Sequence, residues 1–131
     1  MKKEFISWDE YGHLIGELIE AIKKDVPAPK DIFDGVYGIK NGGLPVALAI
    51  HHAFGLPLLD KPTSRTLIVD DISDTGRTLA ELGLQGNKTA AIFSTPWTKV
   101  MPDWHVRQKR DKKIWIVFPY ENKESEGNCD I

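Results

Sequence analysis

The chain has 131 residues, enough for one domain with its own hydrophobic core. Hydrophobic residues make up 41% and charged residues 27%, and the formal net charge of −2 argues against binding to nucleic acids or membranes through bulk charge. The N-terminus lacks the apolar core of a signal peptide, no apolar run reaches membrane-spanning length, and the single cysteine, Cys129, excludes an internal disulfide and a cysteine metal cluster. These features predict a cytoplasmic protein.

The first predicted element is an amphipathic helix that begins at a capping box. Ser7 and Glu10 have the Ser/Thr-x-x-Glu spacing of such a box. Apolar residues then recur at helical spacing to about Lys24, and Pro27 and Pro29 end the helix. We expect this apolar stripe to pack in the core and assign it no chemistry.

A strand, a glycine loop and a second helix follow. The strand is predicted over 35–39, and the helix over 44–54 with Gly55 as its C-terminal cap. The loop between them consists of Lys40, Asn41, Gly42 and Gly43. Such a loop can form a nest of backbone N–H groups that binds an anion, although a plain tight turn is an equally simple interpretation.

A third unit carries the most polar residues. The apolar strand 67–69 is followed by Asp70 and Asp71, and a loop that contains Gly76 opens a helix at about Thr78. Ionised carboxylates only accept hydrogen bonds, so the two acids suit adjacent sugar hydroxyls. Consecutive N–H groups beside a glycine at a helix start suit a phosphate. Together they predict a site for a ribose 5-phosphate.

The segment Thr66 to Leu79 resembles the phosphoribosyl-pyrophosphate (PRPP) signature of the type I phosphoribosyltransferases, which is an apolar strand, two acids, two residues and Asp-Thr-Gly-x-Thr. An ordinary strand-to-helix turn with an acidic cap is the alternative. By this resemblance, Asp74 would be the catalytic acid facing N7 of a purine, and Mg²⁺ would accompany the leaving pyrophosphate. The residues that would bind the ribose and PRPP are Asp70, Asp71, Ser73, Thr75, Gly76, Arg77 and Thr78, with Asp70 and Asp71 contacting the ribose hydroxyls directly or through the metal.

The same resemblance places the pyrophosphate loop at residues 40–43, where the family pattern is Arg/Lys-Gly-Gly. Here the basic residue, Lys40, stands one place early, and Asn41 precedes the glycines. These enzymes usually carry a long mobile loop that closes over the reaction centre. Only residues 56–65, with two prolines, separate the second helix from the signature strand. The flexible loop is therefore predicted to be shortened or missing.

After the signature, a short helix over 78–84 is predicted to break near Gly83 and Gly86, and a strand over 89–93 ends in the polar loop 94–99. Open α/β sheets bind their ligands at such strand ends. In purine enzymes of this family a lysine near this position contacts the exocyclic oxygen of the base. Thr95 stands at the usual place, before a proline, so Lys99 is assigned as the nearest lysine.

The C-terminal part is predicted to contain strands at 102–106 and 114–118 around the basic loop 107–113, which we interpret as a solvated hairpin tip. Residues 114–121 resemble the segment that covers the base in xanthine-guanine and related purine phosphoribosyltransferases. By that resemblance Trp115 would stack on the purine and the Ile116 backbone would meet its 2-position substituent. Simple core packing is the alternative for Trp115.

The predicted fold is α/β, a type I phosphoribosyltransferase (Rossmann-like) core with a mostly parallel sheet flanked by helices. We expect one domain over 1–131, with the core at about 30–95 and a small hood at about 96–121, to which the N-terminal segment is a candidate addition. The resemblance implies a purine phosphoribosyltransferase acting on guanine, xanthine or hypoxanthine in purine salvage, with PRPP as co-substrate, Mg²⁺ as cofactor and a homodimer as the common assembly. A non-catalytic PRPP- or nucleotide-binding regulator is the alternative, and a pyrimidine enzyme is a weaker third.

Overall fold

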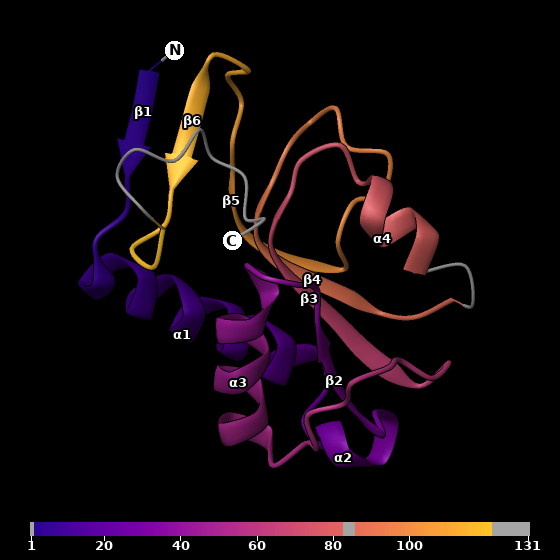
Figure 1. The fold of residues 1–131 in the computed structure, drawn as a ribbon. Helices are drawn as coiled ribbons and strands as arrows, with labels where there is room; N and C mark the ends of the chain where they lie inside the picture. The colour runs from indigo at the N-terminus through magenta and orange to yellow at the C-terminus, as the bar shows by residue number, and fades with distance from the viewer. Residues whose placement is uncertain (1, 83–85, 122–131) are drawn as a thin grey trace.

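The computed structural model of the chain describes residues 2–82 and 86–121, which form two parallel sheets with helices on both faces of the larger one (Figure 1). In chain order the elements are β1 (Lys2–Phe5), α1 (Trp8–Asp25), α2 (Pro29–Ile32), β2 (Gly35–Gly38), α3 (Gly43–Phe54), β3 (Thr66–Ser73), α4 (Arg77–Leu82), β4 (Thr89–Ser94), β5 (Trp104–Gln108) and β6 (Ile114–Val117). The predicted α/β class is confirmed.

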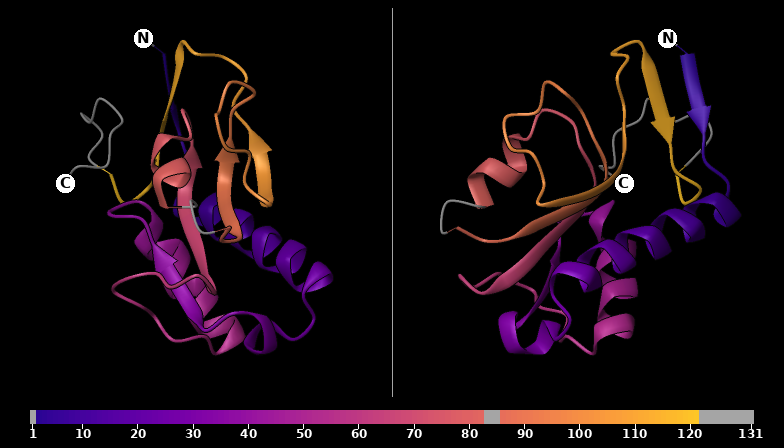
Figure 2. Two further views of the ribbon diagram at one scale, coloured as in Figure 1. Left: turned by 90° about the vertical axis from the view of Figure 1, so that its right-hand side faces the viewer. Right: turned by 180° about the vertical axis from the view of Figure 1, so that it is seen from behind.

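The larger sheet has the strand order β2-β3-β4-β5, and all three pairings are parallel. Helices α1 and α3 cover one face and α4 lies on the other (Figures 1 and 2). Successive residues of β3 point to opposite faces, so Leu67 and Val69 pack with α1 and α3, while Ile68 packs with Leu79 of α4. Coverage of both faces explains why the run Leu67 to Val69 in the first half of this strand is apolar without interruption.

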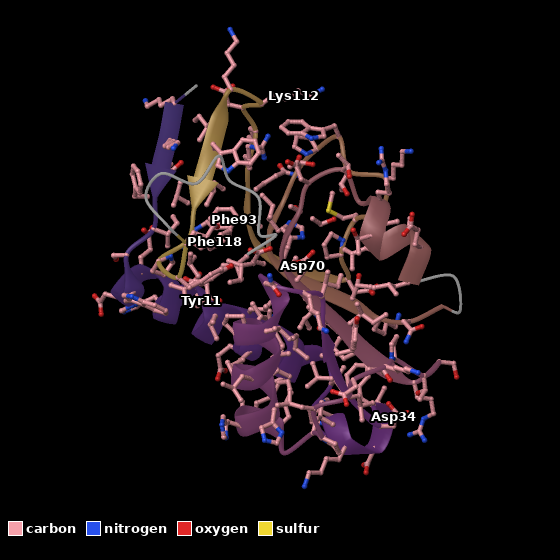
Figure 3. The ribbon with its side chains drawn as sticks, in the orientation of Figure 1. Tyr11, Asp34, Asp70, Phe93, Lys112 and Phe118 are labelled. Atoms are coloured by element: carbon pink, nitrogen blue, oxygen red, sulfur yellow. The ribbon has the colours of Figure 1, made fainter. Side chains whose placement is uncertain are left out.

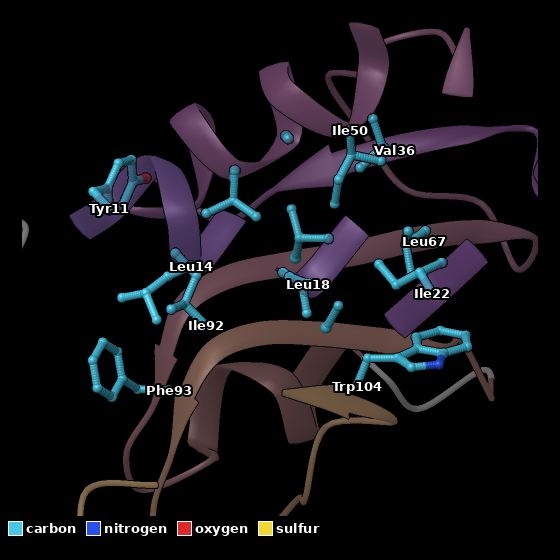
Figure 4. Close-up of a cluster of buried hydrophobic side chains, with 14 of the residues drawn as sticks. Tyr11, Leu14, Leu18, Ile22, Val36, Ile50, Leu67, Ile92, Phe93 and Trp104 are labelled. Atoms are coloured by element: carbon cyan, nitrogen blue, oxygen red, sulfur yellow. The ribbon is translucent and has the colours of Figure 1, made fainter. Parts of the chain in front are cut away.

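The main core lies between the sheet and the inner faces of α1 and α3 (Figure 4). Its α1 face consists of Tyr11, Leu14, Leu18 and Ile22, all buried. The Ser7 hydroxyl accepts a hydrogen bond of 3.1 Å from the Glu10 N–H, so the predicted capping box is confirmed. Gly55 ends α3 in the left-handed conformation, as its sequence position indicated.

A smaller sheet joins the two ends of the described chain, because β1 pairs in parallel with β6 (Figure 2). The expected hairpin around residues 107–113 is therefore wrong. Strand β5 lies at the edge of the main sheet, parallel to β4, because Trp104 packs into the main core. Residues 109–113 then cross from the main sheet to the small one, which we call the hood (β1, β6 and residues 118–121).

Three further features differ from the predicted elements. Strand β3 extends to Ser73 and so includes both acids, which were expected in a turn after the strand. Strand β1 and helix α2 were not predicted. The predicted break at Gly83 and the polar C-terminus with Cys129 lie outside the described residues.

Residues 56–65 run along the edge of β2, and no long loop stands in this part of the chain. Leu58 forms a parallel bridge with Val36, and the Leu59 N–H donates to the Val36 carbonyl at 3.0 Å. The predicted shortening of the flexible loop is confirmed, and the segment is fixed beside the sheet. Among the described helices, none is both long and apolar enough to cross a membrane.

Candidate active site

The carboxyl ends of β2, β3, β4 and β5 meet at one edge of the main sheet because the strands are parallel. At this edge lies a cavity of about 160 Å³. Among the residues expected to bind PRPP or catalyse the reaction, those that line it are Asp70, Ser73, Asp74, Thr75, Gly76, Arg77 and Thr78. Figure 3 shows Asp70 at this edge, between the main sheet and the hood. The structure thus brings together most of the signature residues around one cavity.

The two adjacent acids have different surroundings. Asp70 lines the cavity, whereas Asp71 is only 3% exposed and does not. The Asp71 carboxylate accepts hydrogen bonds from the Tyr120 hydroxyl at 2.6 Å and from the Ile72 N–H at 2.7 Å. Burial, and secondly the neighbouring charge of Asp71, raise the pKa of Asp70 well above its usual range. Asp70 is therefore the acid placed to meet a ligand, and Asp71 lies behind it.

The loop between β3 and α4 is shaped by Gly76, whose φ of +78° favours glycine. A side chain at this position would also collide with the Thr98 hydroxyl and would lie 2.7 Å from the Val100 nitrogen. The Thr75 hydroxyl accepts a hydrogen bond of 3.3 Å from the Arg77 N–H. The Lys99 N–H donates to the Thr75 carbonyl at 2.8 Å, which holds the backbone of this loop against the loop that follows β4.

The predicted pyrophosphate loop connects β2 to α3 at the same edge. Its Lys40–Asn41 peptide bond is cis. Gly42 packs directly on the Asp71 carboxylate, and a Cβ atom at this position would collide with it. A Cβ atom on Gly43 would lie 2.5 Å from the Val69 carbonyl oxygen. Both glycines are therefore required for close approach of this loop to β3.

A second, smaller hollow of about 40 Å³ adjoins Asp74 beneath the hood. It is lined by Ile72, Asp74, Lys109, Trp115, Ile116, Phe118 and Glu121. The Lys109 ammonium lies 3.8 Å from Asp74 Oδ2 and 5.7 Å from the centre of the Trp115 ring, and its side chain is only 8% exposed. Asp74, Trp115 and Ile116 are thus brought together as the sequence suggested.

The lysine of this hollow is one that the sequence analysis missed. Lys99 is exposed and lines neither hollow, although its N–H donates to the Thr75 carbonyl at 2.8 Å. Lys109 directly follows β5, and its N–H donates to the Ser94 carbonyl at the end of β4. If β5 had been predicted as a strand of the parallel sheet, Lys109, which follows its carboxyl end, would have been predicted to lie where such sheets bind their ligands.

Comparison with known proteins agrees with this geometry. No family model and no curated protein sequence matches the chain. Among solved structures, a purine phosphoribosyltransferase from Pyrococcus horikoshii is 29% identical, with 93% of this chain and 96% of that chain covered and a TM-score of 0.73. This chain has the fold and the signature motif of the type I phosphoribosyltransferases.

Two more distant structures share the fold. The xanthine-guanine-hypoxanthine phosphoribosyltransferase of Helicobacter pylori is 16% identical, covering 88% of this chain and 91% of that one, with a TM-score of 0.69. An orotate phosphoribosyltransferase from Aeropyrum pernix is 20% identical, covering 76% and 71% respectively, with a TM-score of 0.58. The fold is therefore common to purine and pyrimidine enzymes, and the base must be argued from the site.

The acids at the cavity could bind a metal ion together with a ligand, but not alone. Within residues 2–82 and 86–121, no group of three His, Cys, Asp or Glu side chains could hold a metal ion alone. Mg²⁺ is typically bound by one or two carboxylates together with substrate phosphates. Asp70, a carboxylate whose charge is disfavoured by burial, would gain from such an ion at the cavity.

Proposed function

We propose that this phosphoribosyltransferase acts in purine salvage, joining guanine, xanthine or hypoxanthine to the ribose of PRPP and releasing pyrophosphate. The observation that carries the proposal is the hollow in which Asp74, Lys109 and Trp115 meet beside the cavity lined by the PRPP signature. An acid, a cation and a flat aromatic ring are the groups that a purine base requires. The 29% identical purine enzyme supports the same base class.

In this proposal the signature cavity holds the phosphoribosyl group. Asp70 would accept hydrogen bonds from the ribose hydroxyls, and the backbone of Thr75 to Thr78 would bind the 5-phosphate. The loop of Lys40 to Gly43 would face the pyrophosphate. Mg²⁺, when bound, would neutralise the leaving pyrophosphate and orient it. Positioning and electrostatics would then supply much of the rate.

The reaction needs one proton acceptor at the base. The purine N9 lone pair forms a bond to C1 of the ribose while the bond from C1 to the pyrophosphate oxygen breaks, and its electron pair leaves with pyrophosphate. The proton on N7 of the purine passes to the Asp74 carboxylate. Asp74 lines both hollows, which supports a position for this acid between the proposed phosphoribosyl site and the proposed base site.

Lys109 would select the base by its exocyclic group. An ammonium group donates hydrogen bonds and accepts none, so Lys109 would bind the carbonyl oxygen at position 6 of an oxopurine and would reject the amino group of adenine. Trp115 would cover the ring face, and Ile116 would meet the 2-position through its backbone. These contacts favour guanine, xanthine and hypoxanthine as a class.

A non-catalytic PRPP- or nucleotide-binding regulator is the second candidate. Its support is the short segment 56–65, which is fixed beside β2 and so leaves the cavity without a closing loop from this part of the chain. Such closure normally excludes water during transfer. A cytoplasmic homodimer, in which a partner subunit covers the site, remains part of our proposal for the enzyme.

Turnover distinguishes the two candidates. Purified protein, PRPP and Mg²⁺ would be incubated with guanine, xanthine or hypoxanthine, and nucleoside monophosphate would be measured by chromatography, with PRPP binding followed by calorimetry. We expect nucleotide from at least one base, and a loss of about 10²-fold or more in Asp74→Asn with PRPP binding retained. PRPP binding without nucleotide from any base would support the regulator.

A further inference from the structure

The loop that follows β4, residues 95–100, holds Asp74 at two points. The Thr95 hydroxyl donates a hydrogen bond of 2.5 Å to the Asp74 main-chain carbonyl. The Trp97 indole N–H donates a hydrogen bond of 2.9 Å to Asp74 Oδ1. Both the backbone and the carboxylate of the proposed catalytic acid are thus fixed by one loop that contributes no residue to the cavity lined by the signature.

The same loop also holds the residues on either side of Asp74. The Ser73 hydroxyl lies 3.0 Å from the Thr98 hydroxyl and donates to the Val100 carbonyl at 3.2 Å. The Lys99 N–H donates to the Thr75 carbonyl at 2.8 Å. The turn from Ser73 to Thr75 is therefore tied to the loop after β4 along its whole length.

The two oxygens of the Asp74 carboxylate have different partners. Oδ1 accepts the Trp97 N–H, and Oδ2 faces the Lys109 ammonium at 3.8 Å. The Lys112 ammonium lies over the Trp97 ring, 5.1 Å from the ring centre. Lys112 belongs to the crossing segment 109–113 and lies near the start of β6 (Figure 3). Trp97 thus links the acid to the chain that forms the base site.

We propose that Trp97 is a positioning residue for Asp74, and the proposal rests on the proposed function. The indole N–H holds Oδ1 and so directs Oδ2 toward Lys109 and the base. A carboxylate on a short side chain can rotate about its last bond, and a hydrogen bond to one oxygen fixes the orientation of the other. Oδ2 is then the atom that receives the N7 proton.

This arrangement fixes the position of Asp74 although the chain has no long closing loop at residues 56–65. Segment 56–65 is fixed at the edge of β2, and it does not contact Asp74 through any described hydrogen bond. Asp74 is instead held by hydrogen bonds from loop 95–100, and the Trp97 ring in that loop contacts Lys112. Preorganised groups of this kind lower the reorganisation that the reaction requires.

Trp97→Phe tests the proposal with the smallest change. Phenylalanine keeps an aromatic ring beneath Lys112 and removes only the N–H donor. We expect kcat with hypoxanthine to fall about tenfold or more, because a hydrogen bond to a charged acceptor is lost from the reacting group. The dissociation constant for PRPP should stay unchanged, since Trp97 does not line the phosphoribosyl cavity.

The chain offers a matched control in Trp104→Phe. The Trp104 indole N–H donates a hydrogen bond of 2.8 Å to Asp25 Oδ2, so the same donor is removed from the same kind of acceptor. Trp104 is the first residue of β5, so it lies at the amino ends of the strands, away from the carboxyl ends where Asp74 lies (Figure 4). We expect its loss to lower the unfolding temperature and to leave kcat and PRPP binding unchanged.

A readout without turnover tests the contact itself. The chain has four tryptophans, and their indole N–H resonances can be assigned by single substitution in a proton–nitrogen correlation spectrum. Asp74→Asn should shift the Trp97 resonance and leave the Trp104 resonance in place. Asp25→Asn should do the reverse.

The outcomes separate the inference from the function on which it rests. An active wild type whose kcat survives Trp97→Phe would overturn the positioning role alone. So would an equal loss of kcat in Trp104→Phe, or a Trp97 resonance that Asp74→Asn does not move. A wild type that binds PRPP and forms no nucleotide would overturn the proposed function and the positioning role together, whatever the spectra show.

Discussion

The Lys109 ammonium lies 3.8 Å from Asp74 Oδ2 and is nearly buried, although the two residues are far apart in the sequence. Two strand ends bring them together, Asp74 just after β3 and Lys109 just after β5. In the proposed function, this ion pair would supply a proton acceptor and a hydrogen-bond donor to one bound base.

Lys109→Met should impair the reaction with the purine base and leave PRPP binding unchanged. Methionine keeps most of the apolar side chain and removes the donor, so kcat/KM for hypoxanthine should fall about tenfold to a hundredfold, with the PRPP dissociation constant retained. Lys88→Met is the control, because Lys88 is an exposed lysine 3.9 Å from Asp103 at the other edge of the sheet. Steady-state kinetics measure both, and equal losses in the two variants would refute the role of Lys109.

Asp70→Asn should stabilise the ligand-free protein at neutral pH. Burial and the charge of Asp71 raise the pKa of Asp70 in the folded state. An acid with a raised folded pKa stabilises the fold fully below its unfolded pKa of about 3.9, and this contribution is lost as the pH rises through the folded pKa. At pH 7 the variant should therefore be more stable than the wild type.

Urea unfolding from pH 3 to pH 8, without PRPP or Mg²⁺, measures this difference. The gain of Asp70→Asn over wild type should disappear below about pH 4. Asp31→Asn, which removes an exposed acid of α2, controls for the loss of one charge. A variant that is less stable than wild type at pH 7 would contradict the assigned burial of the Asp70 charge. The same variant should bind PRPP more weakly.

Gly42→Ala should weaken PRPP binding and lower stability. The added methyl group would collide with the Asp71 carboxylate, so the loop of residues 40–43 or the acid must move, at a cost of about 1–3 kcal/mol. Gly12→Ala on α1 is the control, since the new methyl group would meet nothing within 4 Å besides its neighbours and the backbone of its own helix, and it should stabilise the helix by about 0.5–1 kcal/mol. Thermal unfolding and calorimetry with PRPP check both, and tight PRPP binding by Gly42→Ala would count against a rigid loop.

Tyr120→Phe should loosen the contact between the hood and the acid pair. The variant keeps the ring, which stacks on Phe118 with centroids 5.6 Å apart, and removes the hydroxyl that donates to Asp71 at 2.6 Å. The free energy of unfolding should fall by about 1–3 kcal/mol, because a buried carboxylate loses a donor. Tyr37→Phe, whose hydroxyl does not line the cavity, should change PRPP binding less than Tyr120→Phe does.

The sequence predicted correctly those features that depend on residues close together in the chain. The capping box at Ser7 places the start of α1, and Gly55 places the end of α3, because hydrogen bonds within a few residues determine both positions. The acid-and-glycine pattern from Asp70 to Thr78 located the signature cavity for a similar reason, since the residues that line it come from one short stretch of the chain.

The remaining errors come from contacts between distant segments. Asp70 lines the cavity and Asp71 does not, and the hydrogen bond that holds Asp71 in place comes from Tyr120, which lies in the hood. Lys109 lies beside Asp74 because β5 pairs with β4. Two short strands around one basic loop give the same local sequence pattern in a hairpin, so the sequence did not reveal this pairing. Neither pairing partner is visible in a single sequence window.

The most direct test of the purine proposal is the relative initial rate with hypoxanthine, adenine and orotate in one preparation, at saturating PRPP and Mg²⁺. A hollow that donates from Lys109 and covers the ring with Trp115 should give a kcat/KM for hypoxanthine at least roughly a hundredfold above that for adenine, with no product from orotate. Equal use of adenine, or faster turnover of orotate, would contradict the assignment of this hollow to an oxopurine.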